Sequence, residues 1–386
     1  MSDLISVLMS TFNRADLIEY SINSILGSGQ NIDLIVVIDG STDNTESILA
    51  KFGERIRWKS IQNSGKSGGL NAALEMARGE FVIVADDDDF LIPEALNAHL
   101  AALKENPNAA FTYSPIYRGI SGPSGTIKDR KLFASEDVPA DRQFAHLLFS
   151  MYFALQGCVL RTRHLREIGA FDLKMIRSQD YEMLLRLLRI HSGVFVNAPI
   201  SVVRGHNGTR GASSERFSAG NRAIRGMKYL TEVYDRLYHE LSLAEYLPRS
   251  RADNGWTALI QREALFRRMS VMMRKGVWKH ALHDLRDIVE NHMAIGPISP
   301  TEREACQRAM GNPPSVLDLH QNREVLRILR QILPHPAART ISRHLLKGAY
   351  WASREMTRDH NFWLAAEMLG PSIRTGAIVE FKRLIA

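Results

Sequence analysis

Short apolar runs and amphipathic segments alternate through the first part of the chain. The apolar runs, rich in Val, Ile and Leu, lie at 4–9, 34–39, 56–62, 81–85 and 109–117. Segments with the hydrophobic spacing of surface helices lie at 14–26, 45–52, 69–77 and 93–104. Strands that are apolar on both faces and alternate with helices indicate a mostly parallel sheet covered by helices on both sides. In such a Rossmann-like α/β fold, ligands are expected beyond the carboxyl ends of the strands.

The pattern changes twice in the remainder of the chain. Residues 118–140 contain several Gly and Ser and predict a hairpin or a mobile loop. Between 141 and 204 the pattern predicts a helix, a strand at 158–161, a helix at 180–191 and a strand at 194–203. Beyond 215 the strand signal ends and helical periodicity continues. We therefore predict an α/β domain over 1–214 and an all-α domain over 215–386.

Composition places the chain among globular proteins of a reducing compartment. Of its 386 residues, 45% are hydrophobic and 24% are charged, which suits two packed domains. Its two cysteines, Cys158 and Cys306, exclude a disulfide framework. Residues 1–9 lack the basic start and the longer apolar run of a signal peptide, and no stretch approaches the roughly 18–20 apolar residues of a membrane span. We expect a cytoplasmic protein.

The net charge of +7 is unevenly distributed. Residues 221–386 contain 26 Lys and Arg against 17 Asp and Glu, about +9, and the first 220 residues carry about −2. A basic helical region suits an anionic membrane surface, a nucleic acid or an acidic partner. Its charges are interspersed with acidic residues, as on a plain solvated surface. Peripheral contact with the inner face of a membrane therefore stays open, and no nucleic acid is expected.

Acidic residues follow two of the predicted strands. Asp39 ends the strand at 34–39, where its carboxylate is suited to bind a base or a ribose. The run Asp86-Asp87-Asp88-Asp89 follows the strand at 81–85. Adjacent carboxylates repel one another unless a cation or hydrogen-bond donors compensate. Mg²⁺ or Mn²⁺, bound by one or two carboxylates and phosphate oxygens, accounts for the run, and a solvated acidic turn is the competing interpretation.

The segment 63–71, Asn-Ser-Gly-Lys-Ser-Gly-Gly-Leu-Asn, has some features of a P-loop. That motif requires a glycine six residues before the lysine, where this chain has Ser60 inside a predicted strand. This difference excludes a P-loop nucleotidase. A glycine-rich helix start still offers backbone N–H groups to a phosphate.

Four blocks together resemble the inverting nucleotide-sugar glycosyltransferases of family 2, which have the GT-A fold. The blocks are 6–14, 39–43, 63–81 and 86–89, and the resemblance extends more loosely to about 210. It implies that Asp88 ligates Mn²⁺ or Mg²⁺ and that the donor nucleotide is bound by six residues. These are Thr11, Asn13, Arg14, Asp39, Lys66 and Asp86. Leu70 stands where family members often carry arginine, and Lys66 is expected to supply that charge.

Later segments are similar to the acceptor side of the same family. The resemblance implies that Gln156, Gln179 and Glu182 contact the acceptor and that Asp180 is the general base. An inverting displacement requires such a carboxylate to deprotonate the acceptor hydroxyl. Gln179 replaces the usual glutamate of the family. Glu182 is the alternative base, and a helix cap is the competing interpretation of Asp180.

The segment 204–210 resembles the basic loop of the family, so His206 and Arg210 are expected at the diphosphate. The resemblance implies transfer of a sugar, with inversion, from a UDP-sugar to a saccharide or lipid-linked saccharide, in cell-surface polysaccharide or glycoconjugate synthesis. A sugar-nucleotide pyrophosphorylase is an alternative, although residues 9–14 lack its glycine-rich loop. An inactive nucleotide- or carbohydrate-binding scaffold is another. The helical domain is expected to complete the acceptor site, contact a membrane surface or form an oligomer.

Overall fold

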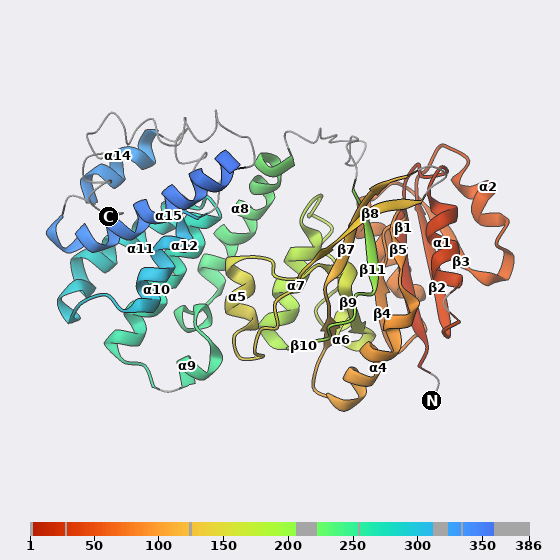
Figure 1. The fold of residues 1–386 in the computed structure, drawn as a ribbon, viewed down its shortest axis with the longest axis horizontal. Helices are drawn as coiled ribbons and strands as arrows, with labels where there is room; N and C mark the ends of the chain where they lie inside the picture. The colour runs from red at the N-terminus through yellow and green to blue at the C-terminus, as the bar shows by residue number, and fades with distance from the viewer. Residues whose placement is uncertain are drawn as a thin grey trace. The chain divides into compact units, whose positions relative to one another are not determined.

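The computed structural model describes residues 3–27, 29–122, 126–205, 222–253, 255–311, 323–332 and 335–358. The chain divides into two compact units, Met1–Arg222 and Ala223–Ala386, and each is described by itself. The first unit combines strands and helices, and the described part of the second contains helices only (Figure 1).

A seven-stranded sheet forms the centre of the α/β unit. Its strands follow the order β10-β6-β9-β4-β1-β2-β3, and neighbours are parallel except at β9, which is antiparallel to β4 and β6. This mostly parallel sheet confirms the predicted fold class. The strands are β1 (Ile5–Thr11), β2 (Ile32–Asp39), β3 (Arg57–Ile61), β4 (Phe81–Val84), β6 (Phe111–Tyr113), β9 (Cys158–Arg161) and β10 (Gly193–Phe195).

A smaller sheet arises where two predicted strands divide. The run predicted as one strand over 109–117 separates at Ser114 and Pro115 into β6 and β7, since proline cannot donate to a continuing ladder. The run predicted over 194–203 likewise separates into β10 and β11. The second sheet has the order β5-β11-β7-β8. Its strands are β5 (Phe90–Leu91), β7 (Ile116–Ser121), β8 (Ile127–Phe133) and β11 (Ser201–Gly205). The antiparallel pair β7 and β8 forms the hairpin that was one of the two predictions for 118–140.

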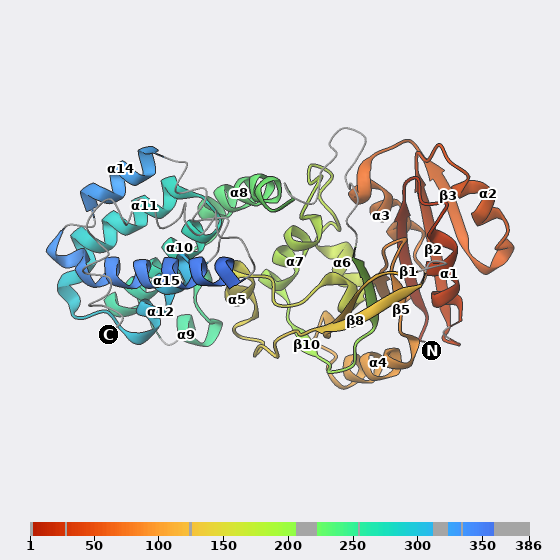
Figure 2. The same cartoon turned by 45° about the horizontal axis from the view of Figure 1, so that its top comes forward.

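Helices cover both faces of the large sheet (Figure 2). Because strand side chains alternate between faces, Val7 and Val36 pack with Ile22 of α1, whereas α3 packs against the other face of β1 and β2. Helix α1 begins later than predicted because Asn13 has a φ of 53° and a turn follows it. The helices are α1 (Ile18–Leu26), α2 (Thr45–Ala50), α3 (Gly65–Met76), α4 (Leu96–Glu105), α5 (Gln143–Phe149), α6 (Thr162–Glu167) and α7 (Gln179–Ile190).

The helical unit is built around α10 (Ala258–Arg274), which packs against α11 and α12. Arg262 of α10 and Glu302 of α12 form a buried bidentate ion pair with N–O distances of 2.8 and 3.0 Å. Ser299 and Glu302 also form a capping box that starts α12. The remaining helices are α8 (Arg222–Glu240), α9 (Arg249–Asp253), α11 (Trp278–Asp287), α12 (Pro300–Ala309), α14 (Arg323–Ile332) and α15 (Arg339–Arg358).

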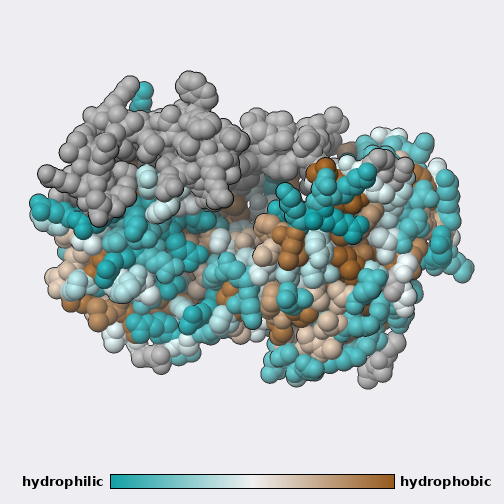
Figure 3. Space-filling view, viewed as in Figure 1, coloured by the Kyte–Doolittle hydropathy of each residue, from teal (hydrophilic) through white to brown (hydrophobic). Residues whose placement is uncertain are grey.

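The surface of the described chain is mixed in character. Among the described residues, no helix combines the length and hydropathy needed to cross a membrane. In the view of Figure 3, hydrophilic residues cover much of the visible helical unit and apolar residues are scattered among them. Membrane contact through this unit therefore stays a prediction.

Candidate active site

The acidic run forms a buried loop between β4 and β5. Asp87, Asp88 and Asp89 are 9%, 4% and 5% exposed. The Ser21 hydroxyl of α1 donates to the main-chain oxygens of Asp86 at 3.2 Å and Asp89 at 2.7 Å. This rules out the solvated acidic turn, because side chains of a mobile surface turn are not buried and anchored in this way.

A buried arginine supports the same loop from β11. Arg204 is 1% exposed. Its backbone N–H donates to Asp89 Oδ1 at 2.8 Å, and its Nε donates to the Asp88 carbonyl at 2.9 Å. In the sequence, the only local sign of this role is that Arg204 directly follows two apolar strand residues. This residue fixes the backbone from which the Asp88 carboxylate projects.

Lys66 and Gln156 converge on Asp86. The Lys66 ammonium donates to Asp86 Oδ1, and Gln156 Nε2 donates to Oδ2 at 3.1 Å. Burial by itself lowers the pKa of Lys66, but the combined attraction of the Asp86, Asp180 and Asp87 carboxylates raises the pKa overall. Lys66 therefore places a permanent positive charge at the site, while Leu70 is buried in the core. Gln156, predicted on the acceptor side, is a partner of Asp86.

The acidic run fits a divalent cation. Asp86, Asp88 and Asp89 each offer a carboxylate oxygen, and these atoms lie within 4.8 Å of one another. Asp89 Oδ2 is buried without a hydrogen-bond partner among the described residues. Burial and the neighbouring Asp88 raise the pKa of Asp87 to about 7, although Arg14, 3.6 Å away, opposes them. Burial and the adjacent carboxylates likewise raise the pKa of Asp89. A cation would relieve this excess negative charge, so the donor set matches Mg²⁺ or Mn²⁺.

Other predicted nucleotide-binding residues lie at the carboxyl ends of β1 and β2. Thr11 ends β1 and is buried. Asn13 accepts from the Thr42 backbone N–H at 2.8 Å, which joins the loops after the two strands. Asp39 ends β2, and its Oδ1 accepts from the Ser64 backbone N–H at 2.6 Å. Because β1, β2 and β4 are parallel, these residues and the acidic run share one edge of the sheet.

Glycines allow α3 to approach this edge closely. A Cβ on Gly69 would lie 2.1 Å from Ser10 Oγ at the end of β1. Gly40 has a φ of +76°, and a Cβ there would lie 3.0 Å from the Asn63 backbone nitrogen. The glycine-rich segment therefore packs the start of α3, which carries Lys66, against the ends of β1 and β2.

Asp180 lies in the first turn of α7, directly after Gln179. The segment before α7 is joined to α3 by two bonds between Asn71 and Phe171, at 2.8 and 3.0 Å. Burial raises the pKa of Asp180, and the Lys66 ammonium acts in the opposite direction. The structure therefore brings Asp180 into the electrostatic environment of Lys66 and Asp86.

The structure does not support Glu182 as a base, and it does not describe two other predicted site residues. Both Glu182 oxygens accept from Arg186, at 2.8 and 2.7 Å, and Glu182 is 2% exposed. To reach an acceptor hydroxyl, this carboxylate would have to leave its ion pair, which disfavours it as a base. His206 and Arg210 lie outside the described residues.

Comparison with known proteins agrees with this architecture. Residues 6–169 match the family described as glycosyl transferase family 2. The chain is 30% identical over 192 residues to the putative teichuronic acid biosynthesis glycosyltransferase TuaG of Bacillus subtilis, covering 48% of this chain and 72% of TuaG. It is 27% identical over 212 residues to an uncharacterized glycosyltransferase of Rickettsia typhi, covering 53% of this chain and 65% of the relative.

Among solved structures, TarS 1–349 of S. aureus in complex with UDP-GlcNAc aligns with a TM-score of 0.53 at 18% identity, over 90% of this chain and 93% of that chain. This likeness concerns the fold. The chain spans between 32% and 65% of the length of its Rickettsia relatives. The family match and the coverage of TuaG establish that the chain belongs to glycosyltransferase family 2.

Proposed function

We propose that the chain transfers a sugar from a UDP-sugar to a saccharide or lipid-linked saccharide, with inversion and with a divalent metal. The observation that carries this proposal is that Lys66 bonds to Asp86 of the acidic run and interacts electrostatically with Asp180 of α7. Asp39 lies at the same edge of the sheet as the acidic run, because β1, β2 and β4 are parallel. The relatives support the substrate class, since TuaG is named for teichuronic acid biosynthesis and the TarS complex contains UDP-GlcNAc. We infer a role in cell-surface polysaccharide or glycoconjugate synthesis.

The donor nucleotide would occupy the ends of β1 and β2. Hydrogen bonds from described residues reach the Asp39 carboxylate only at Oδ1, so Oδ2 is available to a base or ribose. Thr11 and Asn13 line the same loops, and Arg14 lies 4.0 Å from Asp88. Arg14 and Lys66 supply positive charge to a diphosphate that approaches the acidic run.

Asp88 is the proposed metal ligand, with Asp86 and Asp89 beside it. A bound Mn²⁺ or Mg²⁺ supplies electrostatic stabilisation of the leaving diphosphate. Arg204 and Ser21 hold the loop backbone in place before any ligand arrives. The chain therefore contributes a preorganised site rather than a protonated leaving-group acid.

Asp180 is the proposed general base. The raised pKa of Asp180 makes its carboxylate a better proton acceptor than an exposed aspartate. The Lys66 ammonium limits this rise in the pKa. Asp180 takes the proton of the acceptor hydroxyl as that oxygen attacks the anomeric carbon and the bond to the diphosphate breaks. Attack from the face opposite the leaving group gives inversion. Gln179, the residue before Asp180, is proposed to contact the acceptor.

We further propose that 1–214 is the catalytic part and that the helical part from 215 onward completes the acceptor site, contacts the inner face of the membrane or mediates assembly. The excess of basic residues in this part supports an anionic surface as its partner.

A donor panel tests the proposal. UDP-, GDP- and dTDP-sugars are incubated with the full-length chain, Mn²⁺ or Mg²⁺ and saccharide acceptors, and release of nucleoside diphosphate is measured. We expect turnover with a UDP-sugar that EDTA abolishes. Asp88→Ala and Asp180→Asn should both lose transfer, while Glu75→Gln, an exposed carboxylate of α3, should retain it. Full activity of Asp180→Asn refutes the base assignment, and binding of donor without turnover under any condition favours the scaffold alternative.

A further inference from the structure

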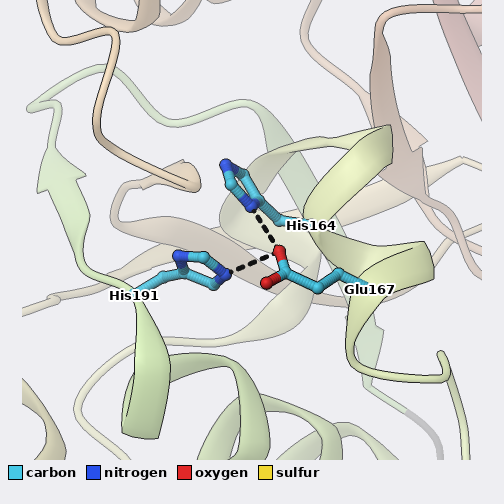
Figure 4. A group of neighbouring side chains, drawn as sticks. All are labelled: His164, Glu167 and His191. Carbon is cyan, nitrogen blue, oxygen red and sulfur yellow. Dashed lines mark hydrogen bonds and ion pairs between the residues drawn. The ribbon is translucent and has the colours of Figure 1, made fainter.

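Two histidines and one glutamate form a cluster at the far end of α7 (Figure 4). His164 and Glu167 lie three residues apart on α6, and His191 follows the last residue of α7. His164 Nδ1 and His191 Nε2 both point to Glu167 Oε2, at 2.9 and 3.0 Å, and the two ring centres are 4.0 Å apart. Three atoms that commonly ligate metals therefore converge from two helices.

These atoms have the spacing of a transition-metal site. Two imidazoles and one carboxylate form one of the donor sets of zinc sites that keep an open coordination position. Metal–ligand distances of about 2.0 Å place the ligands of a tetrahedral zinc ion roughly 3.3 Å apart. The two N–O distances need to lengthen by only a few tenths of an ångström to match, and all three ligand atoms lie within 4.8 Å of one another.

The burial of the three side chains also suits an ion. The histidine side chains are 14% and 15% exposed, whereas the Glu167 side chain is 50% exposed. The protein therefore holds both imidazoles, and the carboxylate faces solvent, from which water can fill the remaining coordination position. Imidazole ligands favour Zn²⁺, Co²⁺ or Ni²⁺ over Mg²⁺, which prefers oxygen.

We propose that His164, Glu167 and His191 bind a zinc-class divalent ion at a site separate from the acidic run. Helix α7 has 12 residues, so it is roughly 18 Å long. Asp180 lies in its first turn and His191 directly follows its end. An ion at the cluster joins the end of α7 to α6 and stabilises the helix whose start positions Asp180.

A neighbouring arginine competes with the ion. Arg163 Nε donates to His164 Nε2 at 3.2 Å, so the proton of the neutral His164 ring is on Nδ1 in the metal-free chain. Metal binding at Nδ1 displaces that proton, and the neutral ring then carries its proton on Nε2, which ends the bond from Arg163. Removing Arg163 therefore removes both a competing bond and a nearby positive charge. If the three side chains only form hydrogen bonds and bind no ion, Arg163→Ala should leave the metal affinity of the chain unchanged.

The test uses the full-length chain carrying Asp88→Ala, which weakens metal binding at the acidic run. Zn²⁺ is titrated against a chromophoric chelator, and Co²⁺ is followed by its visible absorption. We expect one equivalent of Zn²⁺ bound and a rise in the unfolding temperature of the α/β unit. His164→Ala, His191→Ala and Glu167→Gln should lose both effects, and Arg163→Ala should bind more tightly.

His146→Ala is the matched control. Its imidazole lies 3.3 Å from the Glu136 carboxylate in the same unit, and among the described residues this pair belongs to no group of three possible metal ligands. This variant should bind Zn²⁺ as the parent does. Far-UV circular dichroism checks that each variant is folded. The proposal is overturned if the parent binds no Zn²⁺, or if folded His164→Ala and His191→Ala variants bind it unchanged.

Discussion

Replacing Arg204 by methionine tests whether this residue holds the acidic loop. The change keeps the apolar stem and removes the guanidinium bonds to the Asp88 carbonyl at 2.9 Å and the Thr126 carbonyl at 3.1 Å. Loss of a donor to the buried Asp88 carbonyl costs about 1–3 kcal/mol. The partly exposed bond to Thr126 adds about 0.5–1.5 kcal/mol. We expect Arg204→Met to lower the free energy of unfolding of the α/β unit by about 2–4 kcal/mol.

Arg118→Met is the control on the adjacent strand. Arg118 of β7 lies opposite Val203 of β11 and is exposed. Its guanidinium carbon stacks over the Phe133 ring, 3.8 Å from the ring centre. An exposed cation–π contact of this kind contributes under about 1 kcal/mol. Urea unfolding of both variants, followed by circular dichroism, measures the difference. If Arg204→Met costs no more than Arg118→Met, the role assigned to Arg204 is wrong.

Three further changes address charge and packing. Lys66→Met should shift the acid limb of kcat/KM to higher pH, because the Lys66 ammonium opposes the burial that raises the pKa of Asp180; an unmoved limb argues against Asp180 as the base. Burial lowers the pKa of Lys275 from 10.5 to about 7. Between pH 7 and pH 10.5 the unfolded chain therefore binds more protons at this residue than the folded chain does. The free energy of unfolding then rises with pH by up to about 1.4 kcal/mol per pH unit. Lys275→Met should abolish this slope in urea unfolding and give a more stable chain below pH 7; a retained slope contradicts the assignment. Gly69→Ala should cost about 1–3 kcal/mol in thermal unfolding, because its Cβ would lie 2.1 Å from Ser10 Oγ; an unhindered helical glycine would instead gain stability from this change.

The parts of the fold that depend on local pattern were predictable from the sequence. The apolar runs at β1, β2 and β4 identify buried parallel strands, and such strands end at a common edge. The acidic residues directly after β2 and β4 were therefore expected to lie at that edge. Division of the run at 109–117 was signalled only by Pro115, and periodicity could not show that the two halves join different sheets.

The contacts within the site depend on residues that are far apart in the chain. Gln156 donates to Asp86, 70 residues away, and Arg204 bonds to Asp88, 116 residues away. No local pattern encodes such pairs, because they arise from the packing of β11 and the segment before β9 against the acidic loop. Glu182 shows the reverse case, since its partner Arg186 lies one helical turn away and the spacing alone could have indicated the ion pair.

Calorimetric binding of UDP with and without Mn²⁺ tests the central claim most directly, because it requires no knowledge of the sugar or the acceptor. We predict that Mn²⁺ strengthens UDP binding to the full-length chain and that Asp88→Asn abolishes this enhancement, while Glu75→Gln retains it. Equal UDP affinity with and without Mn²⁺, or an enhancement that survives in Asp88→Asn, would contradict the assignment of the acidic run as the metal-dependent donor site.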